Sequence, residues 1–192
     1  SECGAPEFFS GAKLIGIDGA DGKLTPEGIA DALEGLDGSV HSVQPRAISI
    51  SQATEMGTAY SVQEVAAIGA LARSKGLKLH LDGARFANAV AHLGVTPAEA
   101  TWKCGVDVMS FGATKAGALA AEAVVFFDPS LAGEFEYRRK RSGHLASKMR
   151  FVSVQLEAML ADDLWLISGA KSNALATHLA GELKQIPGME IA

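Results

Sequence analysis

Cysteine is scarce in this chain, which has only Cys3 and Cys104 among its 192 residues. Two cysteines are too few for a disulfide framework or a zinc site, so we expect both thiols to be reduced. No apolar run reaches the roughly 18 residues that a membrane span requires, and no charged-then-apolar leader is recognisable. These absences predict a soluble, cytoplasmic protein.

Positive charge is also in deficit, because the formal net charge is -5 at pH 7. A surface of that sign argues against nucleic acid as a partner. Hydrophobic residues make up 48% and charged residues 20%, which is ordinary for a globular domain with a real core. Internal repeats and low-complexity stretches are absent, so the composition predicts an ordinary globular protein without naming its reaction.

Two short apolar runs predict neighbouring parallel strands. Residues 77–81 alternate apolar and other side chains and stop at Asp82 and Gly83, as a strand end would. Residues 106–110 predict a second strand, which leads through a glycine-permitted turn to Lys115. The intervening residues show helical patterns over 85–93 and 96–103. A strand, a helical crossover and a second strand form a parallel unit.

The ends of these two strands carry opposite charges, Asp82 and Lys115. In open parallel α/β sheets the ligand crevice lies outside the carboxyl ends of the strands, so we expect both side chains to face it. Taken alone, a plain ion pair at a strand end is the alternative. A third run, residues 46–51, would bring Thr54 and Glu55 to the same rim if it is parallel too.

The remaining pattern predicts helices around the sheet. Thr25 and Pro26 open one that continues to about residue 36, and the capping-box pattern at Ser61 opens another that stops at Gly76. Further helical stretches are predicted over residues 129–160 and from about 172 to 184, and a strand over 189–192.

Among the five histidines, His80 shares a strand face with Asp82. We interpret it as a buried histidine that is hydrogen-bonded to its neighbours. The other four have no spacing typical of a metal site or of a nucleophile-activating pair, so no metal is predicted. The general base is left unassigned.

Five segments together carry a family resemblance: residues 80–85 (HLDGAR), 110–115 (SFGATK), 121–127 (AEAVVFF), 2–7 (ECGAPE) and 138–151. They closely resemble the low-specificity threonine aldolases, in the β-eliminating lyase group of pyridoxal 5'-phosphate (PLP) enzymes. The resemblance implies an α/β fold with a mostly parallel sheet covered by helices, the large PLP-binding domain of fold type I. Residues 1–164 would belong to that domain, and residues 165–192 would begin a small α+β C-terminal domain.

The same resemblance implies roles for individual residues. Lys115 would hold PLP as a Schiff base, and Asp82 would face the pyridine nitrogen. Arg85 would contact the phenolic oxygen of the cofactor or bind the substrate carboxylate, for which its planar fork is suited; an exposed first-turn arginine is the alternative. Thr54 is the predicted further cofactor contact and Glu55 a weaker one, against a loop that caps its own backbone.

The implied activity is PLP-dependent aldol cleavage of a β-hydroxy-α-amino acid, of the threonine, allo-threonine or phenylserine type, to glycine and an aldehyde. Another fold-type-I reaction, such as β-elimination or amino transfer, and a catalytically silent fragment stay open. The resemblance also implies a homodimer or homotetramer, a phosphate turn and a ring-stacking histidine before Ser1, and a carboxylate-binding arginine after Ala192. The basic run 138–141 is interpreted as a solvated helix face; the alternative, drawn from the resemblance, is that one of its residues, or Arg150, reaches the phosphate of a neighbouring cofactor.

Overall fold

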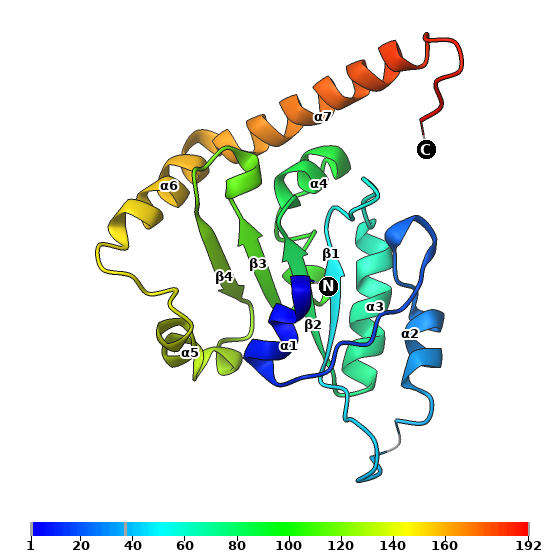
Figure 1. Ribbon diagram of the computed structural model, residues 1–192, viewed down its shortest axis with the longest axis vertical. Helices are drawn as coiled ribbons and strands as arrows, with labels where there is room; N and C mark the ends of the chain where they lie inside the picture. The colour runs from blue at the N-terminus through cyan, green and yellow to red at the C-terminus, as the bar shows by residue number, and fades with distance from the viewer. Residues whose placement is uncertain (1, 37, 192) are drawn as a thin grey trace.

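A four-stranded sheet organises the residues that the computed structural model describes, 2–36 and 38–191. Strands β1 (Ala47–Ser51), β2 (Lys78–Gly83) and β3 (Val108–Gly112) are parallel, and β4 (Glu122–Phe126) runs antiparallel to β3 (Figure 1). The sheet order is the chain order, β1-β2-β3-β4. The predicted mostly parallel α/β fold is therefore confirmed.

Helices surround this sheet, and most of them are short. The α-helices are α1 (Ala5–Ser10), α2 (Pro26–Leu33), α3 (Val62–Ser74), α4 (Phe86–Leu93), α5 (Phe135–Arg141), α6 (Arg150–Leu160) and α7 (Leu164–Leu183). The 3-10 helices are η1 (Glu2–Gly4), η2 (Ala20–Gly22), η3 (Trp102–Cys104), η4 (Thr114–Ala116), η5 (Pro129–Ala132) and η6 (Ala161–Asp163). Within the described residues, no helix is long and apolar enough to cross a membrane.

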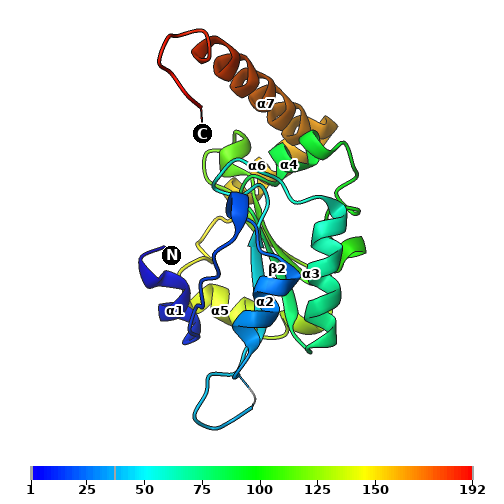
Figure 2. The ribbon, with the colours of Figure 1, turned by 90° about the vertical axis from the view of Figure 1, so that its right-hand side faces the viewer.

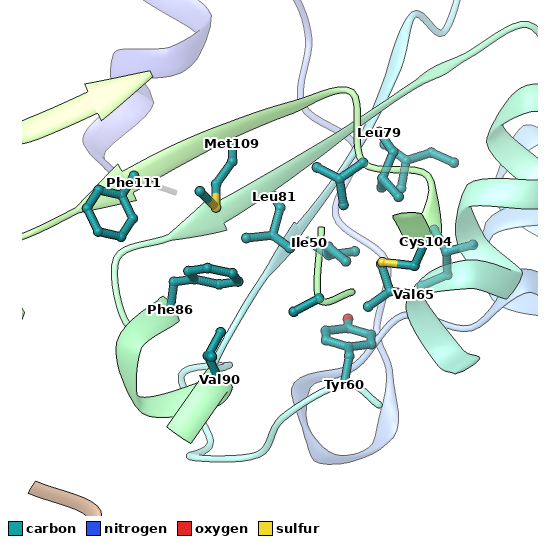
Figure 3. Packing of buried hydrophobic residues seen from close by; sticks show 14 of the residues in the cluster. Ile50, Tyr60, Val65, Leu79, Leu81, Phe86, Val90, Cys104, Met109 and Phe111 are labelled. Carbon is teal, nitrogen blue, oxygen red and sulfur yellow. The ribbon is translucent and has the colours of Figure 1, made fainter. Parts of the chain in front are cut away.

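The two faces of the sheet differ in chemistry. Alternate residues of the three parallel strands are buried and apolar, and they pack against α3 and α4. Figure 3 labels Ile50, Leu79, Leu81, Met109 and Phe111 in this core, and Ile48 belongs to the same cluster. The intervening residues, which include Ser49, His80, Asp82 and Ser110, point to the other face. On that side Figure 2 shows α1 and α5, and α1 contributes no buried residue.

Helix α3 begins and ends where the sequence predicts. The Ser61 side chain accepts a hydrogen bond from the Glu64 backbone N–H, and the Glu64 side chain accepts one from the Ser61 N–H. At the other end Gly76 has a φ of 69°, a left-handed conformation that favours glycine. Helix α2 starts behind Thr25 as predicted but ends at Leu33, short of the predicted end.

The predicted helix over 96–103 is wrong. The segment forms turns followed by η3, although Thr96 and Glu99 still bond to each other as in a capping box. Thr101 leaves helical geometry, with φ −132° and ψ −104°, and its buried hydroxyl donates to the Pro97 carbonyl. Burial of Thr101 and Cys104 against the core therefore outweighs the local helical preference.

The predicted long helix over 129–160 is also wrong, because it is divided into η5, α5 and α6. Gly143 and Lys148 both have positive φ, 82° and 62°, and lie in the break between α5 and α6. The predicted strand at the end of the chain is not formed over 189–191, and Ala192 lies outside the described residues. A strand needs a neighbour to pair with, which a pattern in a single segment cannot supply.

Helix α7 begins at Leu164, earlier than the predicted start near residue 172. Trp165 is buried, stacks on Phe86 and meets Phe111 edge-on. A Cβ on Gly169 would lie 2.7 Å from the Ala87 carbonyl, so this glycine allows a close helix–helix approach. These contacts fix the first half of α7 on α4, while its other end projects from the body (Figure 1).

Candidate active site

The carboxyl ends of β1, β2 and β3 meet in one row across the sheet. Ser51 pairs with Asp82, and Asp82 pairs with Ser110. The backbone N–H of Gln52 donates to the Asp82 carbonyl at 2.9 Å, which continues the row into the loop after β1. The three segments that were predicted to meet at one rim are therefore adjacent.

Asp82 lies in the central strand of this row and is half-buried. Its Oδ1 accepts a hydrogen bond from the Ala84 backbone N–H at 3.0 Å, and no other described residue hydrogen-bonds to the carboxylate. The side chain alternates with buried Leu81 and so projects from the opposite face of the sheet. The carboxylate therefore keeps acceptor capacity for a ligand.

Lys115 lies in η4, directly after β3. Its turn is held by its surroundings, because the Thr114 hydroxyl accepts from the Ala121 N–H and the Gln155 side chain accepts from the N–H groups of Leu119 and Ala120. The lysine itself is exposed and makes no hydrogen bond or ion pair with the described residues. A fixed backbone thus presents an uncommitted amine.

Arg85 is the N-cap residue of α4, because the helix starts at Phe86. Its guanidinium donates two parallel hydrogen bonds to the Glu55 carboxylate, from Nη1 to Oε1 at 2.8 Å and from Nη2 to Oε2 at 3.2 Å; this bidentate ion pair is called the fork below. Hydrogen bonding and charge from Arg85 lower the pKa of Glu55, and the charge of Lys115 lowers it further. Glu55 therefore joins the loop after β1 to the segment after β2, and the charge of Lys115 acts on the same carboxylate.

The loop after β1 is braced from inside. The buried side chain of Gln52 donates to the Tyr60 carbonyl at 2.8 Å and accepts from the Tyr60 N–H at 2.9 Å. Thr54 is also buried, and its hydroxyl lies 2.7 Å from that of Thr58 and accepts from the Thr58 N–H. This geometry agrees with the alternative of a loop that caps its own backbone, and a contact of Thr54 with the cofactor stays a prediction.

Sequence reasoning missed the Glu55–Arg85 fork and the Gln52–Tyr60 brace. The fork had a signal, because opposite charges followed two strands that were both predicted to end at this rim. The brace had none, since a glutamine and a tyrosine eight residues apart fit any polar loop.

His80 is hydrogen-bonded at both ring nitrogens, as predicted, but the residue is half-buried rather than fully buried. Nδ1 lies 2.8 Å from the Ser49 hydroxyl and Nε2 lies 2.9 Å from the Ser110 hydroxyl, so the ring bridges β1 and β3. Burial lowers the pKa of His80, and the nearby charge of Asp82 opposes that shift only in part. Because both ring nitrogens are hydrogen-bonded, we interpret His80 as a residue that cross-links the strands rather than as a general base.

Other sequence features contribute no site in the described part of the chain. No group of three His, Cys, Asp or Glu side chains there could hold a metal ion. Both cysteines are free, and burial raises the pKa of the Cys104 thiol to about 11. In the basic run of α5, Arg138 pairs with Glu134 in solvent and Arg139 donates to the His144 carbonyl. A contact of this run with a neighbouring cofactor stays a prediction.

A mostly parallel α/β sheet with an amine, a carboxylate and an arginine fork at its carboxyl rim defines an enzyme-like ligand site. The chain belongs to the Beta-eliminating lyase family, whose model matches residues 1–192.

Particular relatives narrow the comparison to threonine aldolases. The chain is 50% identical to the low specificity L-threonine aldolase of Pseudomonas sp. and 48% identical to that of Pseudomonas aeruginosa, in each case over 99% of this chain and 55% of the relative. A solved structure of Leishmania major threonine aldolase superposes with a TM-score of 0.87 at 34% identity, over 96% of this chain and 53% of that one. The chain thus spans about half the length of the curated relatives that it matches.

Proposed function

We propose that the full-length protein catalyses PLP-dependent aldol cleavage of a β-hydroxy-α-amino acid, such as threonine, allo-threonine or phenylserine, to glycine and an aldehyde. The observation that supports this proposal is the adjacency of the ends of β2 and β3, because Asp82 and Arg85 lie at the end of β2 and Lys115 follows β3. The named relatives are low specificity L-threonine aldolases, and the resemblance of the chain's motifs to that group implies PLP as the cofactor.

The donor set at the rim fits PLP. The cofactor requires a lysine amine for attachment and an acid beside its pyridine nitrogen. Lys115 is exposed and uncommitted, and Asp82 has spare acceptor capacity. In this proposal Lys115 holds the cofactor and Asp82 faces the pyridine nitrogen. When bound, PLP supplies an electron sink that permits a bond at Cα to break.

The chain's own residues then prepare that chemistry. The Asp82 carboxylate favours the protonated pyridine nitrogen by charge attraction. Arg85 presents N–H donors to an anionic oxygen, either that of the substrate carboxylate or the phenolic oxygen of the cofactor. The same neighbourhood holds Glu55, and Thr54 is proposed as a further contact. Clamping the carboxylate orients the scissile bond, which accelerates a reaction by removing rotational freedom.

Product analysis tests the activity. The full-length protein, loaded with PLP, is incubated with threonine, allo-threonine and phenylserine in turn. We expect acetaldehyde or benzaldehyde in equal amount with glycine. Ammonia with a keto acid would instead assign β-elimination, transfer of the amino group to an added keto acid would assign an aminotransferase, and no product would favour a silent polypeptide.

Three accompanying predictions are carried forward. The division into a large domain, 1–164, and the start of a small one, 165–192, is proposed from the resemblance. A homodimer or homotetramer is proposed for the same reason, whereas the cytoplasmic location is predicted from the sequence itself. Sedimentation velocity of the full-length protein measures the first of these two properties, and a tagged copy in its own cell measures the second.

A further inference from the structure

The fork between Glu55 and Arg85 restricts how the arginine can bind a ligand. A guanidinium has five N–H donors, spread over Nε and the two terminal nitrogens. Glu55 takes one hydrogen from each terminal nitrogen, at 2.8 and 3.2 Å, and so occupies the end of the group. The Nε–H and the outer hydrogens of the terminal nitrogens remain, and none of them bonds to a described residue. The terminal edge of the Arg85 guanidinium is therefore occupied by Glu55 and, among the described residues, the edge that carries Nε is free.

The partner of Arg85 is itself held in place. Glu55 follows Thr54, which is buried and bonded to Thr58 within the loop. At the start of that loop, Gln52 bonds to Tyr60 in both directions and to the Asp82 carbonyl through its backbone N–H. A carboxylate on a braced loop can fix a long side chain that would otherwise sample many rotamers.

Charge supports the same arrangement. Arg85 bonds directly to Glu55, and this contact, together with the charge of Lys115, lowers the pKa of the Glu55 carboxylate. An arginine that is aligned by one carboxylate and keeps free N–H donors can bind a second carboxylate.

We propose that Glu55 is a positioning residue, which anchors Arg85 by its terminal nitrogens and leaves the Nε side free to bind the carboxylate of the amino acid substrate. Glu55 touches the substrate through no bond of its own and acts through Arg85. The inference rests on the proposed function, because it takes the ligand of Arg85 to be the substrate.

Binding of glycine, the proposed product, tests this role without turnover. The full-length, PLP-loaded protein and its Glu55→Gln variant are titrated with glycine by absorbance, and KM and kcat for threonine are measured separately. An exposed ion pair is weak, so the expected effect is a rise of roughly fivefold in the glycine Kd and in KM, with kcat and Tm nearly unchanged. Glu55→Asp, which keeps the charge, should recover part of the affinity.

Two further variants make the result specific. Glu134→Gln removes another exposed carboxylate–arginine pair, that with Arg138 at 3.2 Å, and should leave glycine binding unchanged. In an Arg85→Lys background, which lacks the fork, Glu55→Gln should have no additional effect. Either an unchanged or a tighter glycine Kd in Glu55→Gln would overturn the positioning role. A weaker glycine Kd without any aldehyde from threonine would instead retain that role and refute the aldolase activity.

Discussion

The two ends of the parallel strands both carry charged clusters, but only one cluster is closed. At the amino end, Lys78 pairs with Asp107 at 3.4 Å and with Asp128 at 3.0 Å, and Asp107 also accepts from the Leu79 backbone N–H. At the carboxyl end, Glu55 and Arg85 pair, while Lys115 makes no bond with the described residues and Asp82 accepts only one. Charges that satisfy one another support a fold, whereas uncommitted charges on a fixed backbone are available to a ligand.

The sharpest test of this comparison replaces the lysine of each end. Lys115→Ala should abolish the visible absorbance of lysine-bound PLP and lower kcat by a factor of roughly 10³ or more, because the proposed attachment point is lost. Lys78→Ala is the matched control at the amino end, and we expect it to keep both properties. The comparison breaks if Lys78→Ala abolishes the absorbance or if Lys115→Ala retains it.

A second pair of variants replaces the carboxylates. Asp82→Asn keeps the shape of the side chain but removes its charge, so in the proposed arrangement the pyridine nitrogen would lose the partner that favours its protonated form. We expect PLP to remain attached to Lys115 while kcat falls by roughly 10²-fold, measured by absorbance and by aldehyde release. Asp107→Asn, at the amino end, should change thermal stability and leave kcat close to that of the parent. A near-normal kcat in Asp82→Asn would remove that residue from its proposed role.

His80 lies in β2 between the two ends of the strands. Its replacement tests whether the polar face of the sheet contributes to stability at that position. His80→Gln should lower the free energy of unfolding by about 1 kcal/mol at pH 7, because the ring no longer bridges Ser49 and Ser110. Burial holds the folded pKa of His80 below 6.5, so below that pH the unfolded chain binds the proton more readily. Stability of the parent should therefore fall as the pH drops from 6.5 towards the folded pKa.

Chemical denaturation across that range measures the His80 contribution. The variant lacks the titrating ring, so its stability should decline less steeply than that of the parent as the pH falls below 6.5. Equal slopes for the two proteins would show that the ring is not held neutral by its surroundings.

The sequence predicted the part of the fold that local patterns determine. Alternation in residues 77–81, the capping box at Ser61 and the stop at Gly76 all act within a few residues, and each prediction is confirmed. The predictions at 96–103, 129–160 and the start of α7 failed, because Thr101, Gly143 and Trp165 respond to distant packing or to backbone conformations that periodicity does not encode.

The candidate site divides in the same way. Asp82 and Lys115 were predicted to share a rim because parallel strands end on one side, and the segments that carry them do meet there. Their roles toward PLP stay predictions. The Glu55–Arg85 fork joins side chains 30 residues apart, so its geometry required the structure.

The weakest effect is expected at the amino end of the strands, where Asp128 pairs with Lys78. There the loss of an ion pair can be followed as the pH is lowered. Asp128 accepts from Lys78 and from the backbone N–H and hydroxyl of Ser130, and these bonds lower its pKa from 3.8 to about 2. Its contribution is therefore present above pH 3.8 and is lost as the pH falls towards 2. Asp128→Asn should lower Tm by about 2 °C or less at pH 7, with kcat unchanged, and this difference should shrink between about pH 4 and pH 2. Because Asp128 lies at the opposite end of the strands from Lys115, a loss of activity in this variant would mean that the closed cluster also serves the site, and the distinction between the two ends would fail.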